Sequence, residues 1–208
     1  MASPAVAVRA AEAIPPLNNG DVLAREEFRR RWDLHPEIKR AERIDGIVYA
    51  EMVVGPDHGA AHIIVAMWAG MYAHRAAGVE AGDNVTVRLP ADDVQPDVLL
   101  RRTDSTASRR SSSGIDGPPE FVFEVAATSA AYDLHQKRRA YERGGVPEYV
   151  VWEIFENRLE WFQLVEGRYI RREPDADGII ESIELPGLRL HVPSLLARDV
   201  RTLLDRLG

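Results

Sequence analysis

The sequence contains no cysteine among its 208 residues, so disulfide bonds and thiolate metal sites are both excluded. A chain without disulfides suits a reducing compartment, and we expect a cytoplasmic protein. No apolar stretch is long enough to cross a bilayer, so we expect no membrane partner. Residues 1–21 are rich in Ala and Pro but lack the basic start and the continuous apolar run of a signal peptide. We expect these residues to form a disordered tail.

Lysine is almost absent as well. Lys39 and Lys137 are the only two lysines, and arginine supplies the remaining basic side chains. A lysine at a chemically useful position is therefore less easily explained as an accident. The formal net charge is -7, which argues against a protein that coats nucleic acid nonspecifically, although a local basic patch is enough to bind phosphate.

The rest of the composition is that of an ordinary globular protein, with 45% hydrophobic residues, and residues 22–208 are enough for one domain with a full core. Periodicity predicts helices at 22–31, 56–78, 131–143 and 193–207. It predicts a strand hairpin at 41–53 and strands at 84–89, 94–100, 120–125, 146–155, 158–165, 169–172, 179–183 and 188–192. Residues 101–119 are rich in Ser, Arg, Gly and Pro and predict a surface loop. This order predicts an α/β or α+β fold with a central mixed sheet flanked by helices.

Two acidic residues occur in or beside apolar strands. Asp97 follows Gln95-Pro96, and Glu124 lies within the apolar run Phe121 to Ala127. A carboxylate buried in such a run needs a partner, and a divalent cation is one. On adjacent strands the two carboxylates and the carbonyl of Val125 could hold Mg²⁺, for which Mn²⁺ can substitute. The alternative is that both acids end strands at the surface, which is favoured for Asp97 taken alone but not for Glu124.

Lys137 lies four residues after Asp133 and four before Tyr141, so the three share one face of the predicted helix. Its ammonium could reach the metal site, orient an attacking water and stabilise developing negative charge. An exposed Asp133–Lys137 pair, worth about 0.3–0.5 kcal/mol, explains the same spacing equally well.

Other polar and aromatic groups have simpler explanations beside the functional ones. His58 and His62 are four apart, a spacing compatible with zinc, but no third ligand is evident near them, and we expect the pair to cap and line the helix start. Three clusters remain: Arg101, Arg102, Arg109 and Arg110; Arg138, Arg139 and Arg143; and Trp152, Phe155, Trp161 and Phe162. The arginines could bind phosphate or merely keep surfaces solvated. The aromatics predict core or a dimer interface.

At these residues the chain resembles the Uma-type family of putative restriction endonucleases, within the PD-(D/E)xK nuclease superfamily. The resemblance covers about residues 22–192 and rests on motifs in the expected order. These are Glu42-Arg43-Ile44-Asp45-Gly46, Pro96-Asp97, Phe123-Glu124-Val125, Asp133-Leu134, Lys137, Tyr141 and Gly145-Val146-Pro147-Glu148-Tyr149. It implies a restriction-endonuclease-like core with additional antiparallel strands.

The resemblance also implies roles for single residues. Asp97 and Glu124 would bind metal, and Glu42 would be an auxiliary acid, for which a simple hairpin charge is an equal alternative. Many superfamily members carry the lysine two residues after the glutamate, where this chain has Ala126, so Lys137 would take that role. The family's Ser-Pro-Ser-like turn is replaced here by residues 127–130, Ala-Thr-Ser-Ala.

Three functions follow as hypotheses. The first is a Mg²⁺-dependent endonuclease that cleaves DNA and leaves a 5′-phosphate, for which a homodimer would suit cleavage of both strands. The second is an inactive nucleic-acid-binding or assembly protein on the same fold, favoured if Lys137 points into solvent. The third is a metal-dependent hydrolase of a small phosphate ester. All three require Asp97 and Glu124 to lie close together.

Overall fold

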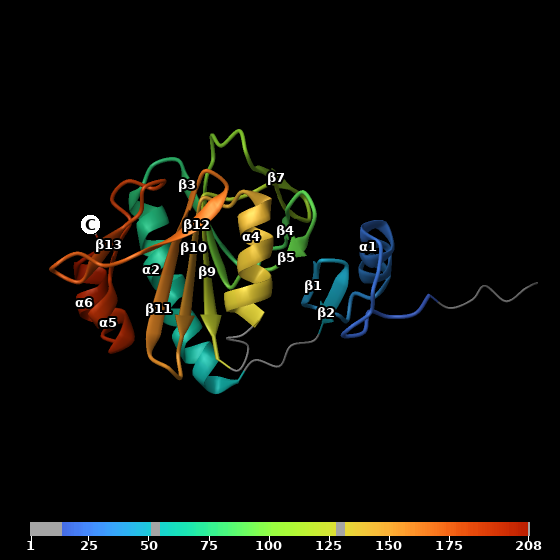
Figure 1. Ribbon diagram of the computed structural model, residues 1–208, viewed down its shortest axis with the longest axis horizontal. Coiled ribbons are helices and arrows are strands. Elements are labelled where there is room, and N and C mark those ends of the chain that lie inside the picture. The colour runs from blue at the N-terminus through green and yellow to red at the C-terminus, as the bar shows by residue number, and fades with distance from the viewer. Residues whose placement is uncertain (1–13, 51–54, 128–131, 208) are drawn as a thin grey trace, which may run out of the picture.

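The computed structural model describes residues 14–50, 55–127 and 132–207 (Figure 1). Its helices are α1 (Arg25–Leu34), α2 (Pro56–Arg75), the π-helix η1 (Asp133–Lys137), α4 (Arg138–Gly144), α5 (Val192–Leu196) and α6 (Val200–Asp205). Its strands are β1 (Ala41–Ile44), β2 (Ile47–Ala50), β3 (Val79–Asp83), β4 (Val87–Arg88), β5 (Asp93–Val94), β6 (Val98–Arg102), β7 (Arg109–Ser111), β8 (Gly114–Asp116), β9 (Phe121–Ala126), β10 (Glu148–Glu153), β11 (Arg158–Val165), β12 (Arg168–Arg172), β13 (Ile179–Glu181) and β14 (Arg189–His191). None of the described helices is long and apolar enough to span a membrane.

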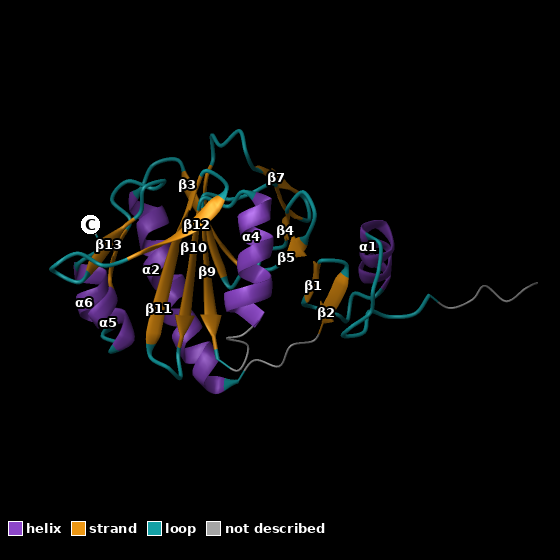
Figure 2. Cartoon of the chain, viewed as in Figure 1, coloured by secondary structure: helices purple, strands orange, loops and turns teal. Residues whose placement is uncertain are grey.

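The central sheet has the order β12-β11-β10-β9-β6-β3 and is mixed, because β9 and β10 are parallel while their outer neighbours are antiparallel. Its two faces carry different helices (Figure 2). Phe121 and Phe123 of β9 pack with Trp68 of α2 on one face, whereas Val122 packs with Ala140 of α4 on the other. Every residue of β9 is buried, as expected for an apolar strand covered on both faces.

A second sheet has the order β2-β1-β5-β4-β8-β7. Its hairpin β1–β2 turns at Asp45 and Gly46, which both have positive φ, the conformation that an Asp-Gly hairpin turn requires. Leu17, Phe28 and Val48 form a small core between this hairpin and α1. Packing therefore begins before residue 22, where we placed the start of the domain.

The fold class is as predicted, but three element predictions were wrong. Residues 101–119 are not all loop, because β7 and β8 pair as a hairpin. The sequence does not show these strands by apolar alternation, because Ile115 is their only buried residue. The predicted helix 193–207 is two helices, α5 and α6, separated at Arg198, which has a φ of 55°. The strand predicted at 94–100 is interrupted at Pro96, which cannot donate to a strand ladder.

Smaller differences concern element ends. The first helix begins at Arg25 and not beside Asp21, because Val22 forms a bridge with Ile47 of the hairpin. The third predicted helix is present as η1 and α4, and it ends at Gly145 in the left-handed conformation that favours glycine at a helix end.

Candidate functional site

The break between β5 and β6 places Asp97 beside Glu124. β6 begins at Val98, which pairs with Phe123 of β9, so Asp97 lies level with the next residues of that strand. The backbone N–H of Asp97 donates to Glu124 Oε2 at 3.3 Å, and the N–H of Val125 donates to Asp97 Oδ2 at 2.8 Å. Both acids are no more than 2% exposed. They are therefore buried neighbours and not surface strand ends.

Lys137 lies at the end of η1 and is 1% exposed. Its Nζ is 2.6 Å from Glu124 Oε1 and 3.1 Å from Glu42 Oε1. The alternative that placed Lys137 in an exposed surface pair is therefore wrong. A π-helical turn is wider than an α-helical one and occurs often at functional sites, and here it brings the lysine to two glutamates from different sheets.

Three further groups orient these glutamates. The backbone N–H of Gln95 donates to Glu42 Oε1 at 2.7 Å, and the Tyr132 hydroxyl donates to Glu42 Oε2 at 3.2 Å. The Tyr141 hydroxyl donates to Glu124 Oε1 at 2.7 Å. Burial, together with the nearby carboxylates, raises the pKa of Tyr141 well above its usual value, so it remains a donor at neutral pH. Sequence reasoning placed Tyr141 on the correct helix face but missed Gln95 and Tyr132.

Asp97 has three partners that sequence reasoning did not assign. Arg40 Nη2 is 3.0 Å from Oδ1, and His58 Nε2 is 3.2 Å from Oδ2. His62 Nε2 is 3.2 Å from the Asp97 carbonyl oxygen and 2.7 Å from Asp83 Oδ1. The expectation that no third ligand lies near the two histidines was wrong, because Asp97 is distant in sequence but adjacent in space. Arg40 carries no comparable signal, because arginine is abundant in this sequence.

Acidic and basic groups gather at this site. Three buried carboxylates, those of Glu42, Asp97 and Glu124, face the cationic groups of Lys137 and Arg40. Burial alone raises the pKa of Asp97, but the hydrogen bond from His58 and the charges of Lys137 and Arg40 outweigh it and hold that pKa well below its usual value. Asp97 is therefore ionised at neutral pH. Clustered carboxylate oxygens are ligands that fit a divalent cation.

The arginines of residues 101–110 lie at the opposite end of β6 from Asp97. Five residues at ~3.3 Å each place Arg102 about 17 Å away. All four are paired within the protein, Arg101 and Arg110 with Glu80, Arg102 with Asp104, and Arg109 with Asp116. Each of these arginines thus has an acidic partner within the protein, away from the cluster.

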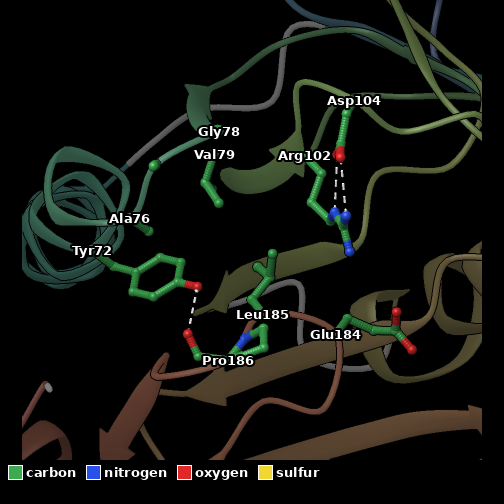
Figure 3. Close-up of a pocket in the computed structure, with 10 residues that line it drawn as sticks. Tyr72, Ala76, Gly78, Val79, Arg102, Asp104, Glu184, Leu185 and Pro186 are labelled. Atoms are coloured by element: carbon green, nitrogen blue, oxygen red, sulfur yellow. Dashed lines mark hydrogen bonds and ion pairs between the residues drawn. The ribbon is translucent and has the colours of Figure 1, made fainter.

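A surface hollow of about 340 Å³ lies at this same far end (Figure 3). Arg102 and Asp104 line one part of it and Leu185 another, and the Tyr72 hydroxyl donates to the Pro186 carbonyl across it at 3.1 Å. It contains none of the clustered carboxylates.

The hairpin aromatics are mainly core. Trp152, Trp161 and Phe162 are buried, whereas Phe155 is 60% exposed at the turn between β10 and β11. Arg138 lies over the ring of Phe162, and Arg143 pairs with Asp45 and Asp92.

Comparisons with protein families and with solved structures agree. Residues 25–193 match the Uma2 family, described as "putative restriction endonuclease". The structure is also similar to the crystal structure of a putative nuclease belonging to DUF820 from Anabaena variabilis ATCC 29413. That match has a TM-score of 0.62 and 12% identity, and it covers 76% of this chain and 89% of the other. At this identity the likeness establishes the fold. No curated protein sequence matches.

Proposed function

Since the chain belongs to the Uma2 family of putative restriction endonucleases, we propose that it is a metal-dependent endonuclease that hydrolyses DNA phosphodiester bonds. The catalytic residues in this proposal are Glu42, Asp97, Glu124 and Lys137. The cofactor in this proposal is a divalent cation, Mg²⁺ or Mn²⁺, and the substrate strand would be left with a 5′-phosphate.

The burial of Lys137 between two glutamates is the observation that carries this proposal. Bringing three carboxylates and an ammonium out of water is costly, and replacing such a group by apolar side chains is often neutral or stabilising. A cluster of this kind is therefore poorly explained by stability. Strongly perturbed, buried ionisable groups gather where chemistry is performed.

The metal would be held by Asp97 and Glu124, with the carbonyl of Val125 as a third oxygen. When bound, it supplies a water with a lowered pKa and neutralises charge on the phosphate. The protein's own groups then have separate tasks. Lys137 would orient the attacking water and stabilise charge on the phosphate oxygens, while Glu42 and Tyr141 fix the position of its ammonium and of Glu124.

The rival hypothesis of an inactive binding protein was favoured if Lys137 pointed into solvent. The contacts of Lys137 with Glu42 and Glu124 support the enzyme hypothesis instead. The third hypothesis, a hydrolase of a small phosphate ester, is separated from the endonuclease by the substrate that the protein cleaves.

The test is cleavage of a long linear duplex DNA, followed by analysis of the product ends. We expect cleavage that requires Mg²⁺ or Mn²⁺, stops with EDTA, and yields ends that a ligase rejoins without added kinase, since they carry 5′-phosphates. Asp97→Asn should reduce the rate by at least about 10²-fold. Hydrolysis of small phosphate esters without DNA cleavage would contradict the proposal and favour the third hypothesis.

A further inference from the structure

His58 and His62 lie one turn apart on α2 and both reach Asp97. Ligand atoms of these three residues all lie within 4.8 Å of one another. The third member comes from the break between β5 and β6, so the group joins two elements that are far apart in the sequence.

The spacing of the His58 and Asp97 ligand atoms suits a common cation. His58 Nε2 and Asp97 Oδ2 are 3.2 Å apart. Two neighbouring ligands at about 2.1 Å from one metal are separated by about 3.0 Å in octahedral geometry and by about 3.4 Å in tetrahedral geometry. A shared metal therefore requires little movement of either side chain.

The histidines also form the more accessible side of the cluster. Their side chains are 12% and 17% exposed, whereas the clustered carboxylates are no more than 2% exposed. Arg40 contacts Oδ1 of Asp97, and Oδ2 faces His58. The partner that competes for His62, Asp83, is 64% exposed, and an ion pair with so exposed a group is weak.

We propose that His58 and His62 are ligands of the metal bound at Asp97, and that this site takes a divalent transition metal of the Mn²⁺, Co²⁺ and Zn²⁺ class in preference to Mg²⁺. The inference rests on the proposed function in that Asp97 is the shared ligand. Its chemical basis is the donor set: Mg²⁺ binds oxygen almost exclusively, whereas imidazole nitrogen suits transition metals. The site thus departs from the Mg²⁺ preference that two carboxylates alone would indicate.

The first part of the test measures binding without any substrate. Mn²⁺ is titrated into the full-length protein, and the free ion is followed by its electron paramagnetic resonance signal, with Mg²⁺ as competitor. Variants are His58→Asn, His62→Asn and the double substitution. The matched control is His74→Asn, an exposed histidine on the same helix. We expect the double variant to bind Mn²⁺ at least about tenfold more weakly, with Mg²⁺ binding and the His74 variant unchanged.

The second part detects the ligand itself. Pulsed paramagnetic resonance of the Mn²⁺-loaded wild type should show coupling to imidazole ¹⁴N, and the double variant should lose it. Circular dichroism and thermal unfolding establish that each variant is folded.

The outcomes separate this inference from the proposed function. Mn²⁺ binding without ¹⁴N coupling, or equally tight binding by the double variant, overturns the histidine ligands but leaves the Asp97–Glu124 metal site standing. Absence of Mn²⁺ binding by the wild type overturns the inference. Histidine-dependent binding without DNA cleavage supports the inference and contradicts the nuclease.

Discussion

Removing the ammonium of Lys137 would leave Glu42 and Glu124 buried without their shared cation. We expect Lys137→Met to lower the free energy of unfolding by about 3–5 kcal/mol, the usual cost of breaking a buried ion pair from one side. The measurement is urea unfolding in EDTA. The control is Lys39→Met, the other lysine, whose Nζ donates to the Pro36 carbonyl at 2.6 Å on the exposed surface. Equal unfolding midpoints for the two variants would show that the cluster does not depend on Lys137.

Tyr141 acts on the site through Glu124. Tyr141→Phe removes a buried hydrogen bond to a carboxylate, which costs about 1.5–3 kcal/mol, and it should slow DNA cleavage by about 10–100-fold, as expected when a group that orients a metal ligand is lost. Tyr72→Phe is the control, since its hydroxyl donates to the Pro186 carbonyl at the far end of the sheet. Similar cleavage rates for both variants would refute the orienting role of Tyr141.

Reading the sequence identified the residues whose position along the chain is itself unusual. Glu124 stands out in an apolar strand, and Lys137 stands out in a chain with two lysines. Arg40 and Tyr132 carry no such signal, because arginine is abundant here and Tyr132 reaches Glu42 only through the fold. The three-dimensional placement of β5, α2 and η1 was needed to see them. The chemical roles of the clustered residues stay predictions until the variants are measured.

At the scale of elements, the β1–β2 hairpin sets the register that carries Glu42 into the cluster. Gly46 has a φ of 85°, and a Cβ built there would meet nothing closer than Arg43 Nη2 at 3.6 Å. The cost of Gly46→Ala is therefore backbone strain, about 1–2 kcal/mol. Gly70→Ala, in the interior of α2 with open space around it, should instead stabilise by about 0.5–1 kcal/mol. Thermal unfolding of both variants tests this; a shift of both in the same direction would contradict it.

The long elements were predictable from their apolar residues, which recur at helical intervals in α2 and form a continuous run in β9. α2 and β9 match the predicted segments closely. The strands β7 and β8 were missed because polar contacts hold them, including the Arg109–Asp116 pair. The break between α5 and α6 depends on a left-handed residue, Arg198, that no glycine marks.

Glu148 connects the elements of the central sheet to the C-terminal segment. On β10 it accepts hydrogen bonds from Trp161 Nε1, the Ile183 N–H and the Ser182 hydroxyl. Burial raises its pKa above 4.5, and these hydrogen bonds only partly offset the effect. A carboxyl group with a raised pKa in the folded state binds its proton more tightly there than in the unfolded chain. Its contribution to stability is therefore full below about pH 4 and declines as the pH rises through the pKa of the folded state.

Glu148→Gln removes this titration. We expect the stability of the wild type relative to Glu148→Gln to fall as the pH rises from about 4 to 7, as measured by urea unfolding at each pH. A difference that is constant with pH would show that Glu148 is not perturbed.

At the scale of the whole molecule, the two large sheets meet at the proposed site. Lys137 of η1 contacts both Glu124 of the central sheet and Glu42 of the second sheet. In addition, Arg29 of α1 pairs with Asp93 of β5 in the second sheet. We propose that the chain from Leu17 onward folds as one unit for this reason.

The most direct test of this account compares two buried glutamates on the neighbouring parallel strands β9 and β10. Supercoiled plasmid is incubated with wild type, Glu124→Gln or Glu148→Gln, with Mn²⁺ or with EDTA, and nicked circles are quantified over time. We predict metal-dependent nicking by the wild type and by Glu148→Gln, and a loss of at least about 10²-fold in Glu124→Gln. Nicking by Glu124→Gln at the wild-type rate would contradict the assignment of the buried cluster as the active site.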